Sequence, residues 1–156
     1  ESQRVIDARN AFVMDSLLQE VTRSGTAARA QATLKRPDVY GKTGTTNDSM
    51  DAWFAGFQRS LAAIVWIGYD NPRKLGDRET GGGLSLPVWI EYMQQVLKGV
   101  PVAEPAVPEG VVNVAGEWYF DEFSGEAGVS SLGLEDKVPA APTEEERTSI
   151  PDIFRR

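Results

Sequence analysis

Apolar residues recur at steps of three and four through residues 7–24, and this period predicts an amphipathic helix. Asp7 has a side chain that commonly caps a helix N-terminus, and Gly25 stands where a left-handed C-terminal cap is expected. We expect a further helical turn at residues 27–32. The apolar stripe of the first helix consists of Ala11, Met14, Leu18 and Val21.

The pattern changes to that of strands in the middle of the chain. Residues 38–46, 52–58 and 61–69 predict three strands, and polar turns at residues 47–49 and 59–60 make them antiparallel neighbours. The third segment is apolar almost without interruption, which predicts that both of its faces are covered. Three tryptophans on these periodic faces are expected in the core: Trp53, Trp66 and Trp89.

A second helix is predicted at residues 87–98. Pro87 suits the first helical turn, and Gly99 and Pro101 end the helix. Residues 71–85, which precede it, are rich in Gly, Arg and Asp and predict a loop, whose three consecutive glycines fit a flexible connection as well as a functional segment. The apolar stripe of the helix consists of Leu86, Ile90, Met93 and Leu97.

The composition changes after Pro101. Repeated prolines indicate a linker, and residues 111–114 and 117–120 predict a short hairpin with exposed or packed aromatic residues. Further on, Pro, Glu and Arg dominate, which is typical of a flexible tail. The predicted organisation is a main unit at residues 1–101, a linker with a small β appendage at 102–138, and a tail at 139–156.

The composition excludes several classes of function. The chain is 41% hydrophobic and 25% charged, which is ordinary for a globular domain. Its net charge of -7, with no basic stripe, argues against binding to nucleic acid. Without cysteine it has neither zinc–thiolate sites nor disulfides, and without histidine any acid–base chemistry must use Lys, Asp, Glu or Tyr.

The segment at residues 38–48 carries the candidate chemistry. It places Lys42 and three threonines among glycines in a strand-like run, which suits the binding of a carboxylate or another oxyanion along a strand edge. A nucleotide-binding P-loop is the competing interpretation of the Gly-Lys-Thr sequence. That loop requires a glycine at the position of Arg36 and a long helix afterwards, whereas turn residues follow here.

Several linked stretches surround this segment. They are GKTGTTND at 41–48, DAWFAGF at 51–57, IVWIGYD at 64–70, GG at 81–82 and LPVWI at 86–90. Their order and spacing resemble the end of the transpeptidase domain of class A, bifunctional penicillin-binding proteins of the 1A type. The resemblance covers about residues 4–101 of the chain.

This resemblance implies an α+β fold, the transpeptidase fold shared with serine β-lactamases, in which helices flank an antiparallel sheet. The chain would supply the last three of that sheet's five strands. The sequence Gly25-Thr26-Ala27 stands where the family has Gly-Thr-Gly. Because the third position departs from the family pattern, no role is assigned to it.

Two other motifs of the family are absent from the sequence. No serine has a lysine three residues later, as in S-x-x-K, and none has an asparagine two residues later, as in S-x-N. The serine nucleophile and its general base are therefore missing. We expect the chain to be the C-terminal piece of a transpeptidase domain, inactive alone and completed by the N-terminal remainder of the same protein.

The resemblance implies roles for four residues. Lys42 would lie beside the serine of S-x-N and add positive potential, and the Thr43 and Thr45 hydroxyls would bind the terminal carboxylate of the substrate. The Thr45 N–H would form half of the oxyanion hole, and Gly44 would let the substrate backbone lie alongside as an added strand. From the residues alone, a surface hairpin with threonines of high strand propensity is the alternative.

The implied activity is peptidoglycan D,D-transpeptidation by serine acyl transfer, without metal or organic cofactor. Its partners would be stem peptides ending in D-Ala-D-Ala and β-lactam antibiotics. The parent would also carry a glycosyltransferase domain and an N-terminal membrane anchor, and would act at the periplasmic face of the inner membrane. The alternatives are a fragment of a serine β-lactamase or D,D-carboxypeptidase, and a non-catalytic binding module. An exposed sheet edge and helix face are expected to make the isolated chain self-associate.

Overall fold

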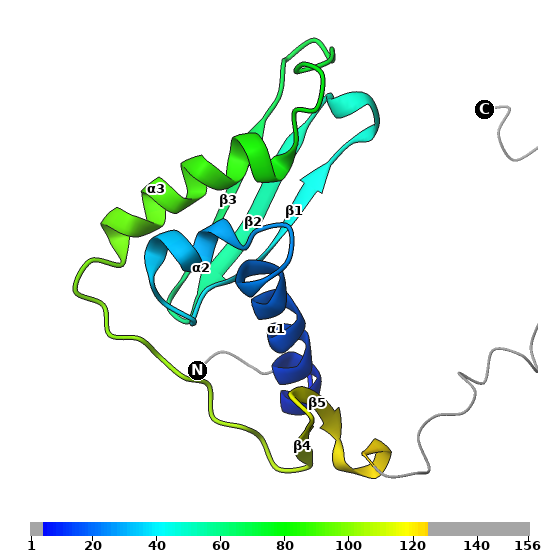
Figure 1. Ribbon diagram of the computed structural model, residues 1–156, viewed down its shortest axis with the longest axis vertical. Helices are drawn as coiled ribbons and strands as arrows, with labels where there is room; N and C mark the ends of the chain where they lie inside the picture. Colours follow the sequence, from blue (N-terminus) through cyan, green and yellow to red (C-terminus); the bar gives the residue numbers. More distant parts are fainter. Residues whose placement is uncertain (1–4, 125–156) are drawn as a thin grey trace, which may run out of the picture.

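The computed structural model describes residues 5–124 and has an α+β fold, as the sequence predicts (Figure 1). Strands β1 to β3 form one antiparallel sheet in the order β1-β2-β3, and β4 pairs with β5 in a separate hairpin. The helices are α1 (Ala8–Arg23), α2 (Arg29–Leu34) and α3 (Leu86–Val96). The strands are β1 (Tyr40–Thr45), β2 (Ala52–Gln58), β3 (Leu61–Ile67), β4 (Val111–Val114) and β5 (Glu117–Phe120).

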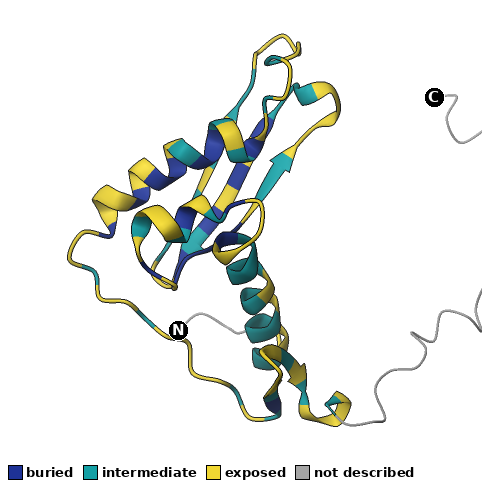
Figure 2. Cartoon of the chain, viewed as in Figure 1, coloured by how far each residue is buried: buried dark blue, intermediate teal, exposed yellow. Residues whose placement is uncertain are grey.

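Helix α1 begins and ends within a residue of the prediction. The Asp7 side chain accepts a hydrogen bond from the Arg9 N–H at 2.9 Å and caps its N-terminus. The predicted left-handed cap at Gly25 is wrong, because that glycine does not have a positive φ. A Cβ there would lie 2.8 Å from the Val21 Cα, so close packing against α1 explains the glycine. The predicted stripe is also wrong at Met14, which is exposed because the sheet covers only the C-terminal part of α1 (Figures 1 and 2).

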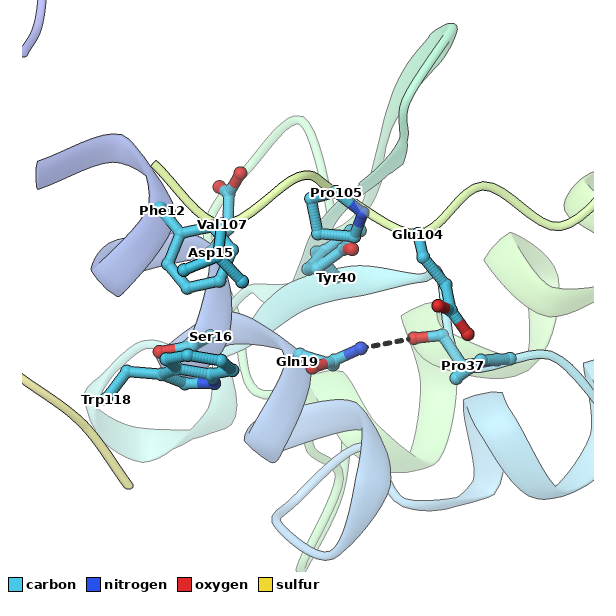
Figure 3. A pocket seen from close by; sticks show the side chains of 10 residues that line it. All are labelled: Phe12, Asp15, Ser16, Gln19, Pro37, Tyr40, Glu104, Pro105, Val107 and Trp118. Atoms are coloured by element: carbon cyan, nitrogen blue, oxygen red, sulfur yellow. Dashed lines mark hydrogen bonds between the residues drawn. The ribbon is translucent and has the colours of Figure 1, made fainter. Parts of the chain in front are cut away.

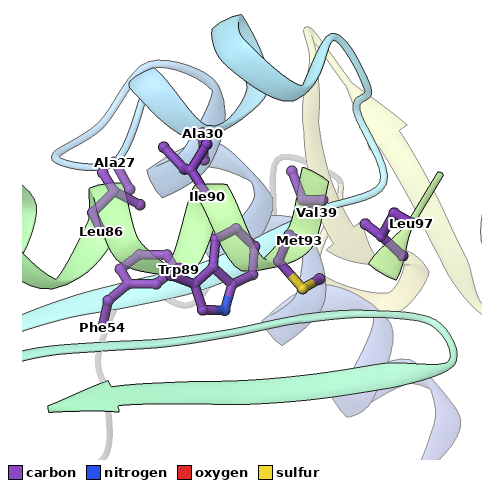
Figure 4. Close-up of a cluster of buried hydrophobic side chains, with 9 residues drawn as sticks. All are labelled: Ala27, Ala30, Val39, Phe54, Leu86, Trp89, Ile90, Met93 and Leu97. Carbon is purple, nitrogen blue, oxygen red and sulfur yellow. The ribbon is translucent and has the colours of Figure 1, made fainter. Parts of the chain in front are cut away.

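The core lies on one face of the sheet, under α2 and α3 (Figure 4). Trp89 of α3 is fully buried, packs on Phe54 of β2 at a centroid distance of 4.9 Å, and donates its indole N–H to the Ala63 carbonyl at 3.1 Å. The predicted apolar stripe of α3 is confirmed, because Leu86, Ile90, Met93 and Leu97 are all buried. The cluster comprises Ala27, Ala30, Val39, Phe54, Leu86, Trp89, Ile90, Met93 and Leu97.

Beyond the end occupied by Tyr40 and Phe57, the opposite face of the sheet has no cover from the described residues, so two predictions are wrong. Residues of β3 alternate between half-buried and exposed, and Ile64 is 68% exposed. Trp53 and Trp66 also lie on this open face, 42% and 44% exposed, with their rings 6.0 Å apart. Among residues 5–124, the continuous apolar run of β3 is therefore covered on one face only, and Trp89 is the tryptophan predicted correctly.

The segment before α3 is more ordered than a loop. Residues Gly81–Ser85 form a π-helical turn that runs directly into α3, capped by the Thr80 hydroxyl, which accepts a hydrogen bond from the Gly83 N–H at 3.1 Å. Ser85 is fully buried and donates its hydroxyl to the Ala52 carbonyl at 2.7 Å. The prediction of a loop is therefore wrong for this part of residues 71–85.

A buried ion pair forms hydrogen bonds with the linker and so holds it next to the start of β1. The Arg36 guanidinium donates two hydrogen bonds to the Asp38 carboxylate, at 2.6 and 2.7 Å, and others to the carbonyls of Val100 and Pro101 at 3.2 Å each. Asp38 also accepts from the Ala103 N–H at 3.0 Å. The chain leaving α3 is thereby held against the segment that leads into β1.

The β4–β5 hairpin confirms its predicted strands and packs beside the N-terminal half of α1 (Figure 1). Trp118 meets Phe12 edge-to-face with ring centroids 5.0 Å apart. The Arg9 guanidinium donates to both carboxylate oxygens of Glu122 at 3.0 Å and lies over the ring of Phe120. The predicted tail at residues 139–156 lies outside the described residues. Within residues 5–124, no helix has the length and apolarity needed to cross a membrane.

Candidate functional site

The candidate residues lie on β1, and the sheet register divides them between two faces. Lys42 pairs with Ala55 on the open face, whereas Thr43 pairs with the buried Phe54 and lies on the face covered by α2 and α3. Thr45 pairs with Ala52 and shares that covered face. The predicted residues are therefore contiguous on one strand but present their side chains in two directions.

Strand β1 is an edge of the sheet, since among the described residues only β2 pairs with it. Across the hairpin, the Thr46 N–H donates to the Asp51 carbonyl at 3.1 Å. N–H groups alternate sides along a strand, so the Thr45 N–H points away from β2 toward the unpaired edge. A donor at this position suits a ligand that lies alongside β1.

Each threonine hydroxyl on the covered face has a partner from a neighbouring segment. The Thr43 and Thr26 hydroxyls are 2.8 Å apart, within hydrogen-bond distance. The Thr45 hydroxyl accepts a hydrogen bond from the Gly81 N–H at 3.1 Å. Two segments far apart in the sequence, the turn before α2 and the turn before α3, therefore fix the side chains of β1.

The glycines before α3 are part of this site, which the sequence analysis left open between two interpretations. A Cβ at Gly81 would lie 2.5 Å from the Gly44 carbonyl oxygen and still closer to the Trp53 carbonyl oxygen. A Cβ at Gly82 would lie 3.2 Å from the Thr26 carbonyl oxygen. Gly81 therefore lets the turn touch the backbone of the β1–β2 hairpin. In the sequence, the three consecutive glycines were the feature that indicated a functional segment here.

Lys42 is exposed, and its ammonium donates to the Thr43 carbonyl at 2.9 Å. No carboxylate among residues 5–124 lies within ion-pair distance of it. By contrast, Lys74, from the segment after β3, pairs at 3.2 Å with Asp48 at the tip of the β1–β2 hairpin. The positive charge on the open face of β1 is thus available to an anionic group from outside the described residues.

The start of β1 is held by Asp38, which is 2% exposed. Burial raises the pKa of its carboxyl, but hydrogen bonds from Arg36, the Ala103 N–H and Gln58 outweigh burial and lower the pKa to about 2. Asp38 therefore stays ionised and paired at neutral pH. This network fixes the direction in which the chain enters the Lys42–Thr45 segment.

Taken together, the edge of β1 offers a cation, hydroxyl groups and an outward N–H, a set that can bind a carboxylate and polarise a carbonyl. Among the described residues there is no group of three or more acidic, histidine or cysteine side chains that could hold a metal ion. The strand continues into a short turn at Asn47–Ser49 and then β2, with no long helix after Lys42. This contradicts the P-loop interpretation.

No family model matches the chain. It is 44% identical over 153 residues to penicillin-binding protein 1A of Neisseria flavescens, an alignment that covers 97% of this chain and 19% of that protein. It is 50% identical over 113 residues to penicillin-binding protein 1A of Pseudomonas aeruginosa, covering 72% of this chain and 14% of that protein.

Among solved structures, the fold is similar to a 2.6 Å crystal structure of penicillin-binding protein 1A from Haemophilus influenzae. The TM-score is 0.67 at 36% sequence identity, and the match covers 71% of this chain and 18% of that one. The chain thus spans less than a fifth of the length of the relatives that it matches.

Proposed function

Because this chain is homologous to part of penicillin-binding protein 1A, at 44–50% identity, we propose that it is the C-terminal portion of a transpeptidase domain. Its proposed function is peptidoglycan D,D-transpeptidation, in which a serine attacks the penultimate D-Ala carbonyl of a stem peptide. The observation that supports this most is the edge strand at Lys42–Thr45, with its exposed cation, hydrogen-bonded hydroxyls and outward N–H.

Each residue of the strand has a role in this proposal. Lys42 adds positive potential beside the serine of the missing S-x-N motif. Thr43 and Thr45 bind the carboxylate of the substrate or of a β-lactam. The outward Thr45 N–H completes half of the oxyanion hole, a donor typically worth about 3–4 kcal/mol of transition-state stabilisation. Gly44 leaves room for the substrate backbone alongside β1.

The proposal requires a nucleophile from elsewhere, because the sequence has no S-x-x-K and no S-x-N motif. The N-terminal remainder of the same protein would supply both, together with a glycosyltransferase domain and a membrane anchor. The site of action would be the periplasmic face of the inner membrane, and β-lactams would acylate the same serine. The isolated chain would be inactive.

We also propose that the chain divides into residues 1–101, the transpeptidase portion, residues 102–138, a linker with the β4–β5 appendage, and residues 139–156. Two sets of contacts support a close association of the appendage with the first unit. Arg36 and Asp38 form hydrogen bonds with the backbone of the linker, and Trp118 packs on Phe12. The appendage would therefore fold together with α1.

Intact-mass spectrometry after incubation with penicillin tests the proposal. We expect no adduct on the isolated 156-residue chain, and one penicillin per molecule on the longer protein that contains this chain with an S-x-x-K segment. Absence of the adduct from the longer protein would favour a non-catalytic binding module. Rapid hydrolysis of the penicillin adduct would favour a β-lactamase. In a separate assay with a stem peptide, release of D-Ala without cross-linking would favour a D,D-carboxypeptidase.

A further inference from the structure

Hydrogen bonds fix the C-terminal half of α1 against the chain that leads into β1. The Gln19 amide N–H donates to the Pro37 carbonyl at 2.9 Å (Figure 3). Three residues further along the helix, the fully buried Thr22 hydroxyl donates to the Val39 carbonyl at 2.6 Å. Both acceptors are backbone atoms, and the second bond is shielded from solvent. These contacts therefore set the register between α1 and β1.

A third contact, beyond the end of α1, joins two side chains instead. The Thr26 hydroxyl lies 2.8 Å from the Thr43 hydroxyl of β1, and either oxygen can be the donor. Thr26 is exposed and Thr43 is half-buried, so water would hydrate both hydroxyls if this hydrogen bond were absent. An exposed bond between neutral groups contributes little to stability, because a bond to water replaces it. The attachment of the turn to the strand therefore does not explain this contact.

The turn that carries Thr26 is held firmly by its neighbours. Ala27 is fully buried in the core, and its N–H donates to the Val21 carbonyl at 3.0 Å. Gly25 lies so close to α1 that a Cβ there would be 2.8 Å from the Val21 Cα. The backbone of Thr26 is thus fixed on both sides, and its hydroxyl is preorganised next to that of Thr43.

The hydroxyl pair keeps one O–H donor for a ligand. Two hydroxyls carry two hydrogens, and the bond between Thr26 and Thr43 uses one of them. Two residues further along the same face of β1, the Thr45 hydroxyl accepts from the Gly81 N–H at 3.1 Å and keeps its own O–H to donate. This face of β1 therefore presents two O–H donors, which match the two oxygens of a carboxylate.

We propose that Thr26 is a positioning residue of the carboxylate-binding strand. Its O–H donates to the Thr43 hydroxyl, which in turn donates to the carboxylate of the ligand. Donation in this direction polarises the Thr43 O–H, so its hydrogen bond to the carboxylate is stronger than that of an isolated hydroxyl. The inference rests on the proposed function of Thr43 and Thr45, and it adds a residue 17 positions before Thr43 that does not itself touch the substrate.

The rate of acylation of the longer protein by a fluorescent penicillin tests this inference. Thr26→Val keeps the shape of the side chain and removes the hydroxyl, so we expect it to lower the second-order rate constant about fivefold. Thr26→Ser retains a hydroxyl and should recover most of the rate. Thr33→Val makes the same change at an exposed position of α2, and this matched control should react at the unmodified rate.

A double-mutant cycle separates positioning from a merely structural role. If Thr26 acts through the Thr43 hydroxyl, Thr26→Val should have no further effect in a protein that already carries Thr43→Val. Losses of the two variants that multiply independently would overturn the inference. So would a Thr26→Ser variant that reacts as slowly as Thr26→Val, because the loss would then come from the altered turn and not from the hydroxyl.

The unmodified longer protein distinguishes failure of this inference from failure of the proposed function. If the unmodified protein takes up no penicillin, the proposed function is wrong and the role of Thr26 is wrong with it. If the unmodified protein is acylated and Thr26→Val reacts at the same rate, the role of Thr26 alone is overturned and the proposed function stands.

Discussion

Gly81 lies so close to the β1–β2 hairpin that its missing side chain is a requirement of the site. A methyl group there would overlap the carbonyl oxygens of Gly44 and Trp53, and both are backbone atoms that cannot move independently. The same residue donates its N–H to the Thr45 hydroxyl. Gly81 thus couples the turn before α3 to the strand that carries the proposed carboxylate-binding residues.

The variant Gly81→Ala is therefore expected to destabilise the chain by about 1–3 kcal/mol, the usual cost of overpacking a tight contact. Urea unfolding followed by circular dichroism measures the change. Gly83→Ala is the matched control, because a Cβ there would meet only the Thr80 hydroxyl at 3.4 Å. Equal midpoints for the two variants would show that the contact at Gly81 is not tight.

Asp38 predicts a dependence of stability on pH. Its carboxyl pKa falls from 3.8 to about 2 on folding, so its contribution is fully present above pH 3.8 and is lost as pH falls through about 2. This lowering of the Asp38 pKa corresponds to roughly 2–2.5 kcal/mol of stability at neutral pH. When the free energy of unfolding is measured by urea denaturation at several pH values, Asp38→Asn should lack this loss of stability between pH 4 and 2. The control Asp77→Asn should retain it. An unchanged profile in Asp38→Asn would contradict the role of the ion pair.

The β4–β5 hairpin is held in place by contacts with α1, so these contacts stabilise the hairpin and not the whole fold. Arg9 contributes two hydrogen bonds to Glu122 and a cation–π contact with Phe120 at 4.6 Å, all partly exposed to solvent. Contacts of this kind contribute about 1 kcal/mol together. This is too little to control global unfolding but enough to change local opening of the hairpin.

We expect Arg9→Ala to reduce hydrogen-exchange protection of the β4 and β5 amides about fivefold, with no change in α3. Arg59→Ala, at an exposed turn-side position, is the control. Equal loss of protection in α3 would mean that the hairpin and the main sheet open as one unit, contrary to this account.

The sequence predicted most elements because their signals are local. The α3 stripe at steps of three and four, the strand register around the Asn47–Ser49 turn and the β4–β5 hairpin all follow from neighbouring residues. The features that were predicted wrongly depend on tertiary packing. Gly25 is required by contact with Val21 and not by a left-handed φ, and the exposed side of Trp66 depends on what covers the sheet.

The candidate site was predictable in part for the same reason. The GKTGT sequence identified the strand, but the partners of its hydroxyls, Thr26 and Gly81, come from segments 17 and 36 residues away along the chain. Likewise, the fastening of the linker by Asp38 joins residues 65 positions apart. Such contacts have no local pattern, so only the structure brings them together.

Among residues 5–124, one face of the sheet is covered and most of the other face is open (Figure 2). Exposed apolar side chains on adjacent strands favour association. We therefore expect the isolated chain to sediment as a dimer or larger species, and Ile64→Asp to shift it toward the monomer. Val88→Asp, on the outer side of α3 and 48% exposed, is the control and should leave the distribution unchanged. A monomeric unmodified chain would contradict this expectation.

We propose that the edge of β1 binds the carboxylate of the substrate in a site that the rest of a longer protein completes. We would measure the rate of acylation of that longer protein by a fluorescent penicillin, and compare the unmodified protein, Lys42→Ala and the control Lys74→Ala, a lysine after β3 that pairs with Asp48 at the tip of the β1–β2 hairpin. We expect Lys42→Ala to slow acylation about a hundredfold, consistent with loss of an electrostatic group at the reacting centre, and Lys74→Ala to react at the unmodified rate. Acylation of Lys42→Ala at the unmodified rate would contradict it.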